Sequence, residues 1–492
     1  MFVFPFHETL VLMKHLPRIL QGGMGAGVSN WRLAQAVSRL GQLGIVSSTA
    51  IDQIFIRRLG AGDPDGAMRR GMEMFPFPAM ARRVWDEYFV PGGKARSQPY
   101  RTTPMHTHID ARKLVELCIV SNFVEVALAR LDHSHEVGIN LLEKVQTVHL
   151  PSLYGAMLAG VGYVLMGAGI PLHIPGVLDR LAVHKPVEYR LTVASAPAEV
   201  QVRFDPRDFA EGELPTLKRP KFLAIVSSNT LATTMLRRSN GRVDGLVIET
   251  HRAGGHNAPP RGKPLRTAAG EPLYGERDQV DFAALRALDV PFWLAGNYAS
   301  AARLREALDL GAAGVQVGTA FEFAEESGLD PALKAAVIQQ ILDRQAQVFT
   351  DPLASPTGFP FKVVQLAHTL SDPPTYEARE RVCDLGFLRE PYWIADAEGS
   401  GSAGRIGYRC SAEPVAAYIA KGGRASETEG RKCLCNALLA NIGLAQLRGE
   451  KSAEMPLITA GEGIHQIAQF LRPGHSRYSA SDVVRQMLDD SA

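Results

Sequence analysis

The sequence predicts an α/β protein built on a (β/α)8 TIM barrel, and three observations lead to this prediction. Short apolar runs end in glycine or another small residue, and each is followed by a stretch with helical periodicity. This alternation repeats eight times before residue 328, and the 46 glycines of the 492-residue chain suit many tight strand-to-helix turns. Alternating strands and helices form right-handed βαβ units with a parallel sheet. Because no GxGxxG opens the chain, we favour a closed barrel over an open doubly wound sheet.

The eight expected strands share a short apolar core, and the expected helices lie between them. The strands are residues 18–23, 44–48, 137–142, 163–168, 221–228, 245–250, 291–296 and 314–319. The helices are residues 30–42, 110–131, 152–160, 174–183, 229–239, 281–288 and 300–311.

Two insertions interrupt the expected barrel of residues 1–328. Residues 52–109 predict helices and loops at one end of the barrel, and residues 186–220 contain an alternating pattern that predicts a hairpin or a strand excursion. Residues 329–492 follow as a mainly helical C-terminal region.

Composition excludes several classes of protein. A net charge of +2 provides no electrostatic basis for binding nucleic acid. Five cysteines are too few for a disulfide scaffold, and the N-terminus lacks the features of a signal peptide, so we expect a cytoplasmic protein. Residues 145–178 carry no Asp, Glu, Lys or Arg, but glycines and a proline divide them into pieces of helix and strand length, so we predict no membrane association.

The stretch HRAGGH follows the sixth expected strand, at the end where barrel enzymes place their chemistry. Gly254 and Gly255 remove side chains where a flat ligand could approach the backbone. His256 then provides a titratable group with an unperturbed pKa near neutrality. A plain tight turn with an exposed histidine is the alternative interpretation of this motif alone.

The other strand ends favour the functional interpretation. The seventh and eighth strands end in Gly296-Asn297 and Gly318-Thr319, and loops at these places in a barrel commonly bind phosphate. Thr319 could instead be only a helix N-cap. Around the same mouth, three further features suit a planar heterocycle: space at Gly22 and Gly23, the thioether of Met24, and the amide of Asn140. Together these residues predict a site for a phosphorylated planar cofactor.

In this order and spacing, the motifs QGGMG, GIN, AGGH, LAGN and QVGTAF resemble the nitronate monooxygenase family, also called 2-nitropropane dioxygenase-like. The resemblance covers roughly residues 17–328 and implies an FMN-binding TIM barrel. It implies that His256 is the active-site histidine and that Gly296, Gly318 and Thr319 contact the FMN phosphate. It also implies that Gly23, Met24 and Asn140 lie around the isoalloxazine.

The resemblance leaves the reaction open. One candidate is oxidation of alkyl nitronates with O2 through the flavin. A second is NAD(P)H-dependent reduction of an enoyl thioester in fatty-acid or polyketide synthesis, because this family includes such enoyl reductases. That reaction implies an acyl-thioester substrate and an acyl carrier protein as partner. The third candidate, a non-catalytic flavin-binding synthase subunit, leaves His256 without a purpose. The oligomeric state stays open, and a homodimer is compatible with the sequence.

The sequence departs from the family pattern at two places. Asn297 stands where many members have a second glycine, so its side chain either contacts the phosphate or shapes the turn. Thr-His-Arg-Ala precedes Gly254 where many members have Glu-Ala. The long insertion and C-terminal region are more similar to the synthase-associated enoyl reductases, which puts the substrate in doubt.

Two C-terminal features complete the predictions. Residues 355–363 could fold over the barrel mouth, where Phe359 and Phe361 would shield a flavin. The other feature is a group of cysteines that could form a four-thiolate site or serve as buried small hydrophobes. They lack paired C-x2-C knuckles, so we assign no metal site: Cys383, Cys410, Cys433 and Cys435.

Overall fold

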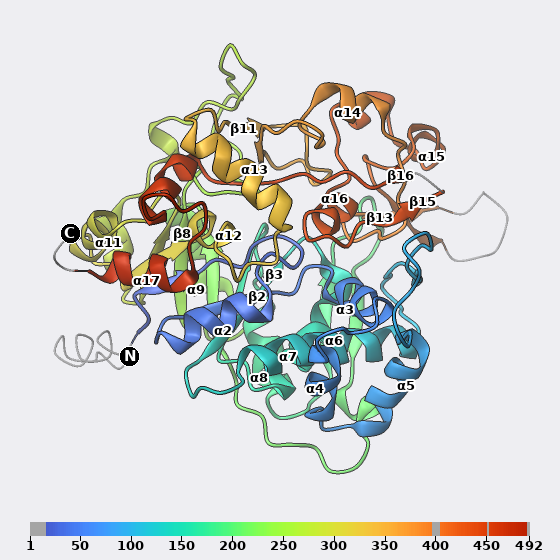
Figure 1. Ribbon diagram of the computed structural model, residues 1–492. Coiled ribbons are helices and arrows are strands. Elements are labelled where there is room, and N and C mark those ends of the chain that lie inside the picture. Colours follow the sequence, from blue (N-terminus) through green and yellow to red (C-terminus); the bar gives the residue numbers. More distant parts are fainter. Residues whose placement is uncertain (1–15, 396–403, 450–451, 490–492) are drawn as a thin grey trace.

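The computed structural model describes residues 16–395, 404–449 and 452–489, and it confirms the expected barrel (Figure 1). The eight parallel strands stand in the order β1-β10-β9-β8-β7-β4-β3-β2. The ring closes between its end strands, because Leu43 N–H donates to Ile19 O at 3.1 Å and Gln21 N–H donates to Leu43 O at 2.9 Å. The strands are β1 (Ile19–Gln21), β2 (Gly44–Ser47), β3 (Val137–Leu142), β4 (Tyr163–Gly167), β7 (Lys221–Val226), β8 (Gly245–Glu249), β9 (Phe292–Ala295) and β10 (Gly314–Val317).

The barrel interior explains why the strands read as apolar runs. Side chains such as Leu20, Leu165, Val247 and Trp293 fill the inside of the ring, while the opposite face of each strand meets the helices. The Trp293 indole N–H donates to Pro17 O at 2.8 Å, so the polar edge of this large side chain is satisfied. Burial on both faces therefore requires apolar residues at consecutive positions.

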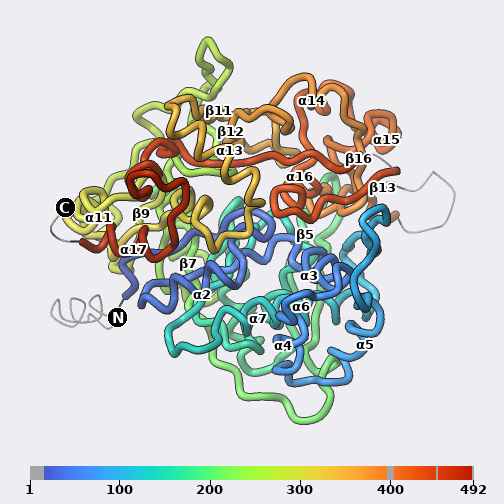
Figure 2. Tube along the Cα trace, in the orientation of Figure 1, coloured from blue at the N-terminus to red at the C-terminus, as the bar shows by residue number. Residues whose placement is uncertain are grey.

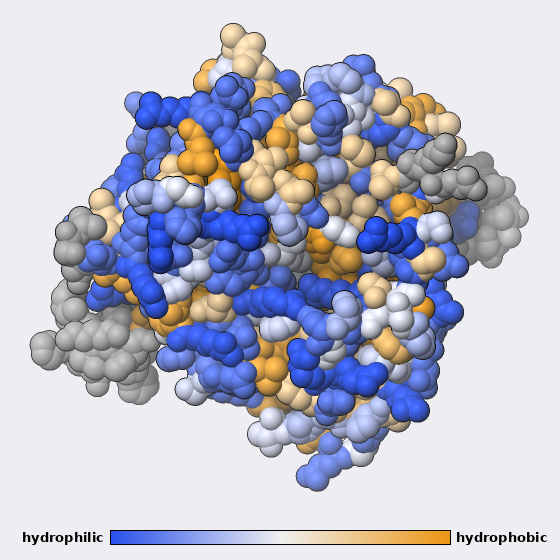
Figure 3. Space-filling model, in the orientation of Figure 1, coloured by the Kyte–Doolittle hydropathy of each residue, from blue (hydrophilic) through white to orange (hydrophobic). Residues whose placement is uncertain are grey.

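The expected helices between the strands are confirmed: α2 (Trp31–Arg39), α6 (Arg112–Ala129), α7 (His149–Leu158), α8 (Ile174–Leu181), α9 (Asn229–Arg238), α10 (Phe282–Arg286) and α11 (Ala301–Asp309). The charge-free residues 145–178 hold α7, β4 and the start of α8. Among the described residues, no helix is long and apolar enough to cross a membrane. On the face shown in Figure 3, hydrophilic residues predominate and hydrophobic residues form small separate groups. The N-terminal residues on which the signal-peptide prediction rests lie outside the described part of the chain.

Both insertions have the predicted character. The first holds α3 (Ile51–Gly60), α4 (Ala67–Glu73) and α5 (Pro78–Tyr88), followed by a long loop. The second is an antiparallel hairpin of β5 (Val187–Leu191) and β6 (Val200–Phe204), whose inward residues alternate with exposed ones.

The C-terminal region contains helices, as expected, but also three antiparallel hairpins that the sequence analysis missed. Its strands are only two to five residues long, too short for a clear alternating pattern. The division of the chain at residue 328 stays a prediction. The elements are α12 (Thr319–Glu322), α13 (Pro331–Leu342), β11 (Val348–Asp351), β12 (Phe361–Val364), α14 (Pro373–Ala378), β13 (Glu390–Ile394), β14 (Arg405–Arg409), α15 (Val415–Ala420), α16 (Leu434–Ala440), β15 (Leu447–Arg448), β16 (Ser452–Ala453) and α17 (Ala480–Leu488).

The last helix returns to the barrel. Figure 2 shows the chain leaving the barrel, passing through the C-terminal region and ending beside α2 and α11. Helix α17 packs against these two helices, which follow β1 and precede β10, and it buries Val483, Val484 and Met487. It therefore occupies the place in the outer layer between the helix after β1 and the helix before β10, and this layer depends on residues far away in sequence.

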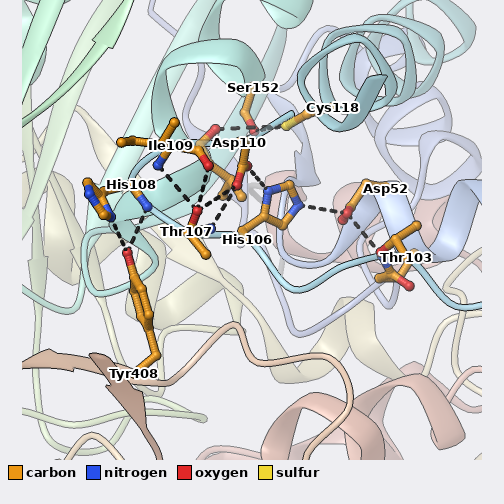
Figure 4. A network of polar contacts seen from close by, with 12 residues as sticks. Asp52, Thr103, His106, Thr107, His108, Ile109, Asp110, Cys118, Ser152 and Tyr408 are labelled. Atoms are coloured by element: carbon orange, nitrogen blue, oxygen red, sulfur yellow. Dashed lines mark hydrogen bonds and ion pairs between the residues drawn. The ribbon is translucent and has the colours of Figure 1, made fainter. Parts of the chain in front are cut away.

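The long loop of the first insertion is anchored by a buried histidine (Figure 4). His106 Nε2 lies 3.0 Å from an Asp52 carboxylate oxygen, and its Nδ1 contacts Asp110. Burial by itself would lower the pKa of His106, but the hydrogen bonds to Asp110 and Asp52 raise it to about 9. The imidazole is therefore cationic at neutral pH and joins α3 to the loop.

We expect this histidine to make stability depend on pH. A folded-state pKa above the unfolded value of 6.5 contributes stability that is complete below pH 6.5 and is lost as the pH rises through about 9. The difference corresponds to about 3 kcal/mol in the free energy of unfolding. Urea unfolding at pH 6 and pH 9.5 measures this loss. His106→Gln should flatten the pH dependence, while the same change at exposed His475 should not; equal slopes for both variants would contradict the assignment.

Candidate active site

A cavity opens at the carboxyl ends of β1, β3, β8, β9 and β10, and all the site residues predicted from the sequence line it. The structure thus brings together side chains and glycines that lie between positions 22 and 319 of the chain. They are Gly22, Gly23, Met24, Asn140, Gly254, Gly255, His256, Gly296, Asn297, Gly318 and Thr319.

His256 is partly buried at the cavity wall and is held by the β11–β12 hairpin. Its Nε2 lies 2.7 Å from Ser355 Oγ, and its ring packs edge-on against Phe361 with centroids 4.8 Å apart. Two backbone hydrogen bonds join the segments: Lys362 N–H donates to Gly255 O at 3.0 Å, and Asn257 N–H donates to Pro360 O at 2.9 Å. Residues 355–363 thus lie at the barrel mouth, as predicted, and Phe361 lines the cavity, whereas Phe359 does not.

Burial lowers the pKa of His256 to about 4. The imidazole is therefore neutral at physiological pH, so one ring nitrogen donates and the other accepts. Ser355 engages Nε2, and within the described residues Nδ1 has no hydrogen-bond partner. A neutral ring of this kind is a poor proton donor at neutral pH but can donate a hydrogen bond to an anion.

The loop after β9 forms a tight cradle. Gly296 has φ +101°, and a Cβ there would approach Thr250 Oγ1 to 2.2 Å, so this position requires glycine. Asn297 follows with φ +68°, a conformation that asparagine tolerates better than most residues, so it shapes the turn. Its Oδ1 is buried and has no partner among the described residues. The side chain is therefore also available to a ligand.

The loop after β10 lies beside this cradle. Gly318 is the N-cap of α12, and Thr319 is the first helical residue, so Thr319 is not an N-cap. The Thr319 hydroxyl oxygen accepts from Gly461 N–H at 2.8 Å and can still donate its own proton. The backbone N–H groups of Phe321 and Glu322 donate to Gly318 O at 2.8 and 3.0 Å, which leaves those of Thr319 and Ala320 in this turn for a phosphate.

After the first strand, Gly23 allows the backbone to contact the side chain of Asn140. A Cβ on Gly23 would lie 2.2 Å from Asn140 Cβ, so only glycine fits against this asparagine. Asn140 Nδ2 donates to Gly23 O at 3.4 Å, and Met24, next to Gly23 in the chain, lies beside Gly318. The three expected heterocycle-binding residues are thus neighbours.

A segment of the C-terminal region, which we name the closing segment (Thr459–Phe470), joins the two halves of the site. Gly255 N–H donates to Thr459 Oγ1 at 2.7 Å, which ties the segment to the His256 loop. The bond between Gly461 and Thr319 ties it to the loop after β10. The sequence analysis missed this segment, because the sequence of a helix-rich C-terminal region does not indicate which of its turns packs against the barrel mouth.

Two carboxyl groups at the cavity were also missed. Burial raises the pKa of Glu249, the last residue of β8, to about 7. Burial raises the pKa of Glu322 in α12 to about 8, although the cation of Lys334 lowers it. Glu249 could have been predicted from the sequence, because the last residue of a barrel strand points to the mouth when the residue before it faces the helices.

The cavity fits a phosphorylated flavin by its chemistry. Four oxygen atoms that line it are buried and have no hydrogen-bond partner in the described residues: Asn297 Oδ1, Gln316 Oε1, Glu322 Oε1 and Gln466 Oε1. Buried acceptors without partners are costly, so a donor-rich ligand is expected to satisfy them. The ribityl hydroxyls and ring N–H of FMN are such donors, and the two glycine loops suit its phosphate.

A closed parallel barrel with glycine loops, an imidazole and unpaired acceptors at its mouth is the architecture of a cofactor-binding barrel enzyme. Residues 191–353 match the profile of the nitronate monooxygenase family, described as NMO. The resemblance seen in the sequence is therefore confirmed, over well under half of the chain. It supports an oxidoreductase with a flavin cofactor. None of the curated proteins compared matches the chain.

Solved structures with low identity are also similar. FabK from Thermotoga maritima is 18% identical with a TM-score of 0.39, covering 73% of this chain and 75% of that chain. Nitroalkane oxidase from Streptomyces ansochromogenes is 16% identical with a TM-score of 0.45, covering 97% and 96%. The enoyl reductase domain of MlnA from Bacillus amyloliquefaciens is 10% identical with a TM-score of 0.46, covering 97% and 95%.

Proposed function

We propose that this protein is an FMN-dependent oxidoreductase that oxidises alkyl nitronates with O2. The observation that carries the proposal is the neutral His256 imidazole at the wall of a glycine-lined cavity, with one ring nitrogen held by Ser355. The family match over residues 191–353 supports the same chemistry. When bound, the flavin accepts the electrons that leave the substrate.

The residues of this chain suit a substrate that is already an anion. A nitronate has lost its proton, so its oxidation requires no strong base. With a pKa of about 4, His256 is a weak base, but its neutral N–H is able to donate a hydrogen bond to a nitronate oxygen. Ser355 orients the ring, and Phe361 packs edge-on against it. Their role is to hold the donor in place and to limit water at the reacting atoms.

Enoyl-thioester reduction with NAD(P)H and an acyl carrier protein is the second candidate. That reaction needs a proton for the product, and a histidine with a pKa near 4 is a poor source at neutral pH. Glu249 favours this candidate, because its pKa of about 7 makes it a proton donor available at the same cavity. A purely flavin-binding role is the third candidate. It gives the Ser355–His256 hydrogen bond no function.

The test uses the purified full-length protein. We expect it to be yellow and to release FMN, identified by chromatography after heating. Anaerobic stopped-flow then separates the reactions: propyl nitronate should bleach the flavin, and NADPH should not. Bleaching by NADPH, followed by reoxidation with an enoyl thioester, would establish the second candidate. FAD, or no flavin, would refute the assignment of the cofactor.

A further inference from the structure

Four of the five cysteines gather around one small enclosed cavity in the C-terminal region. Cys383 follows α14, Cys410 follows β14, and Cys433 and Cys435 stand at the start of α16. The rest of the lining is mainly apolar and includes Leu388. Their spacing along the chain gave no metal signature, but folding brings three separate segments to one place.

The surroundings of these sulfur atoms differ from those of buried hydrophobes. The side-chain amide of Asn436 donates to Cys433 Sγ at 3.5 Å. The side chains of Cys383 and Cys410 also interact with each other. N–H donors stabilise an anionic sulfur, whereas a thiol that only fills space has no need of them.

The cluster also lies near positive charge. Arg389 and Arg379 interact electrostatically with it. Three acidic residues are close as well, and each is paired with a cation: Glu413, Asp384 and Glu454. Burial raises the pKa of the Cys433 and Cys435 thiols, and contact with Cys383 together with burial raises that of Cys410. Thiolates in one apolar cavity would repel one another strongly, so a cation bound among the four sulfurs is what would stabilise their thiolate forms.

We propose that Cys383, Cys410, Cys433 and Cys435 form a four-thiolate site for a thiophilic metal, either a zinc ion or an iron–sulfur cluster. Both use the same ligands. In the described part of the chain, no three His, Cys, Asp or Glu side chains converge on one ion position. A single zinc ion therefore requires the thiols to turn into the cavity, whereas a cluster fills more of the space between them.

This metal site would stabilise two segments that adjoin the active site. Cys435 faces the cysteine cavity, and Leu438, one helical turn later in α16, lines the active-site cavity. Pro356 lines the cysteine cavity, and the preceding residue, Ser355, holds His256. The metal would thus fix the segment that holds the imidazole and the helix that lines the active-site cavity. The proposal does not depend on which substrate the enzyme oxidises or reduces.

Metal analysis of the full-length protein tests the proposal. Protein purified anaerobically without a histidine tag should contain about one zinc per chain, or iron with an equal amount of acid-labile sulfide. Zinc alone identifies a single ion, and iron with sulfide identifies a cluster. After metal removal and loading with Co²⁺, a zinc-type site should show thiolate-to-cobalt absorption.

Variants locate the metal. Cys410→Ser and Cys435→Ser should each weaken metal binding at least about tenfold. Cys118→Ser is the matched control, because Cys118 is buried beside Ser152 and does not line the cysteine cavity; it should retain the metal. Wild-type protein that holds no metal as purified and takes up none from Zn²⁺, or from Fe²⁺ with sulfide, would overturn the proposal even if the variants fail to fold. Equal metal in all three variants would overturn it too.

Discussion

Replacing His256 by alanine is expected to lower turnover about 10²–10⁴-fold while the flavin stays bound. The imidazole lies at the cavity wall with Nε2 held by Ser355, so its loss removes the hydrogen-bond donor aimed at the substrate but none of the phosphate-binding loops. Steady-state kinetics with propyl nitronate and the flavin content of the purified variant measure the two effects.

Asparagine at the same position distinguishes two roles. If His256 stabilises charge through a hydrogen bond, His256→Asn should recover part of the activity; if it transfers a proton, it should recover little. His251→Ala is the matched control, because His251 stacks on Tyr274 in the same loop with ring centroids 4.1 Å apart and does not line the cavity. Unchanged kcat/KM in His256→Ala would contradict the assignment of a function to the HRAGGH motif.

Gly318→Asp is expected to abolish retention of FMN with the fold intact. A Cβ at Gly318 would meet only Met24, at 3.6 Å, so the change is tolerated sterically. A carboxylate beside the flavin phosphate would repel it by about 4 kcal/mol for each pair of unit charges at 4 Å, or about a thousandfold in affinity. Flavin absorbance of the purified variant gives the occupancy, and circular dichroism gives the fold.

The control for this variant has the same shape without the charge. Gly318→Asn should retain clearly more FMN than Gly318→Asp, because only the aspartate repels a dianion. Full occupancy in Gly318→Asp would mean that the phosphate binds elsewhere. Equal loss in both variants would mean that size, not charge, decides binding at this loop.

The sequence by itself determined the barrel. A strand buried on both faces must be apolar at consecutive positions, so runs such as residues 163–168 and 245–250 were recognisable without any neighbour. The end of each parallel strand lies at the same mouth, which is why Gly23, His256 and Gly318 could be assigned to one site from their places after strands. Both inferences use only the local hydrophobic pattern and the rule that sites in a barrel lie at the carboxyl ends of the strands.

Only the tertiary structure decided what covers that mouth and what surrounds each group. Residues 355–363 were expected at the mouth, but the closing segment and the contact of Ser355 with His256 were not, because they depend on long-range packing that local periodicity does not encode. The pKa values near 4 for His256 and near 7 for Glu249 arise from burial, which a sequence does not record. The four cysteines show the same limit: spacing along the chain argued against a site, and folding of three distant segments placed them around one cavity.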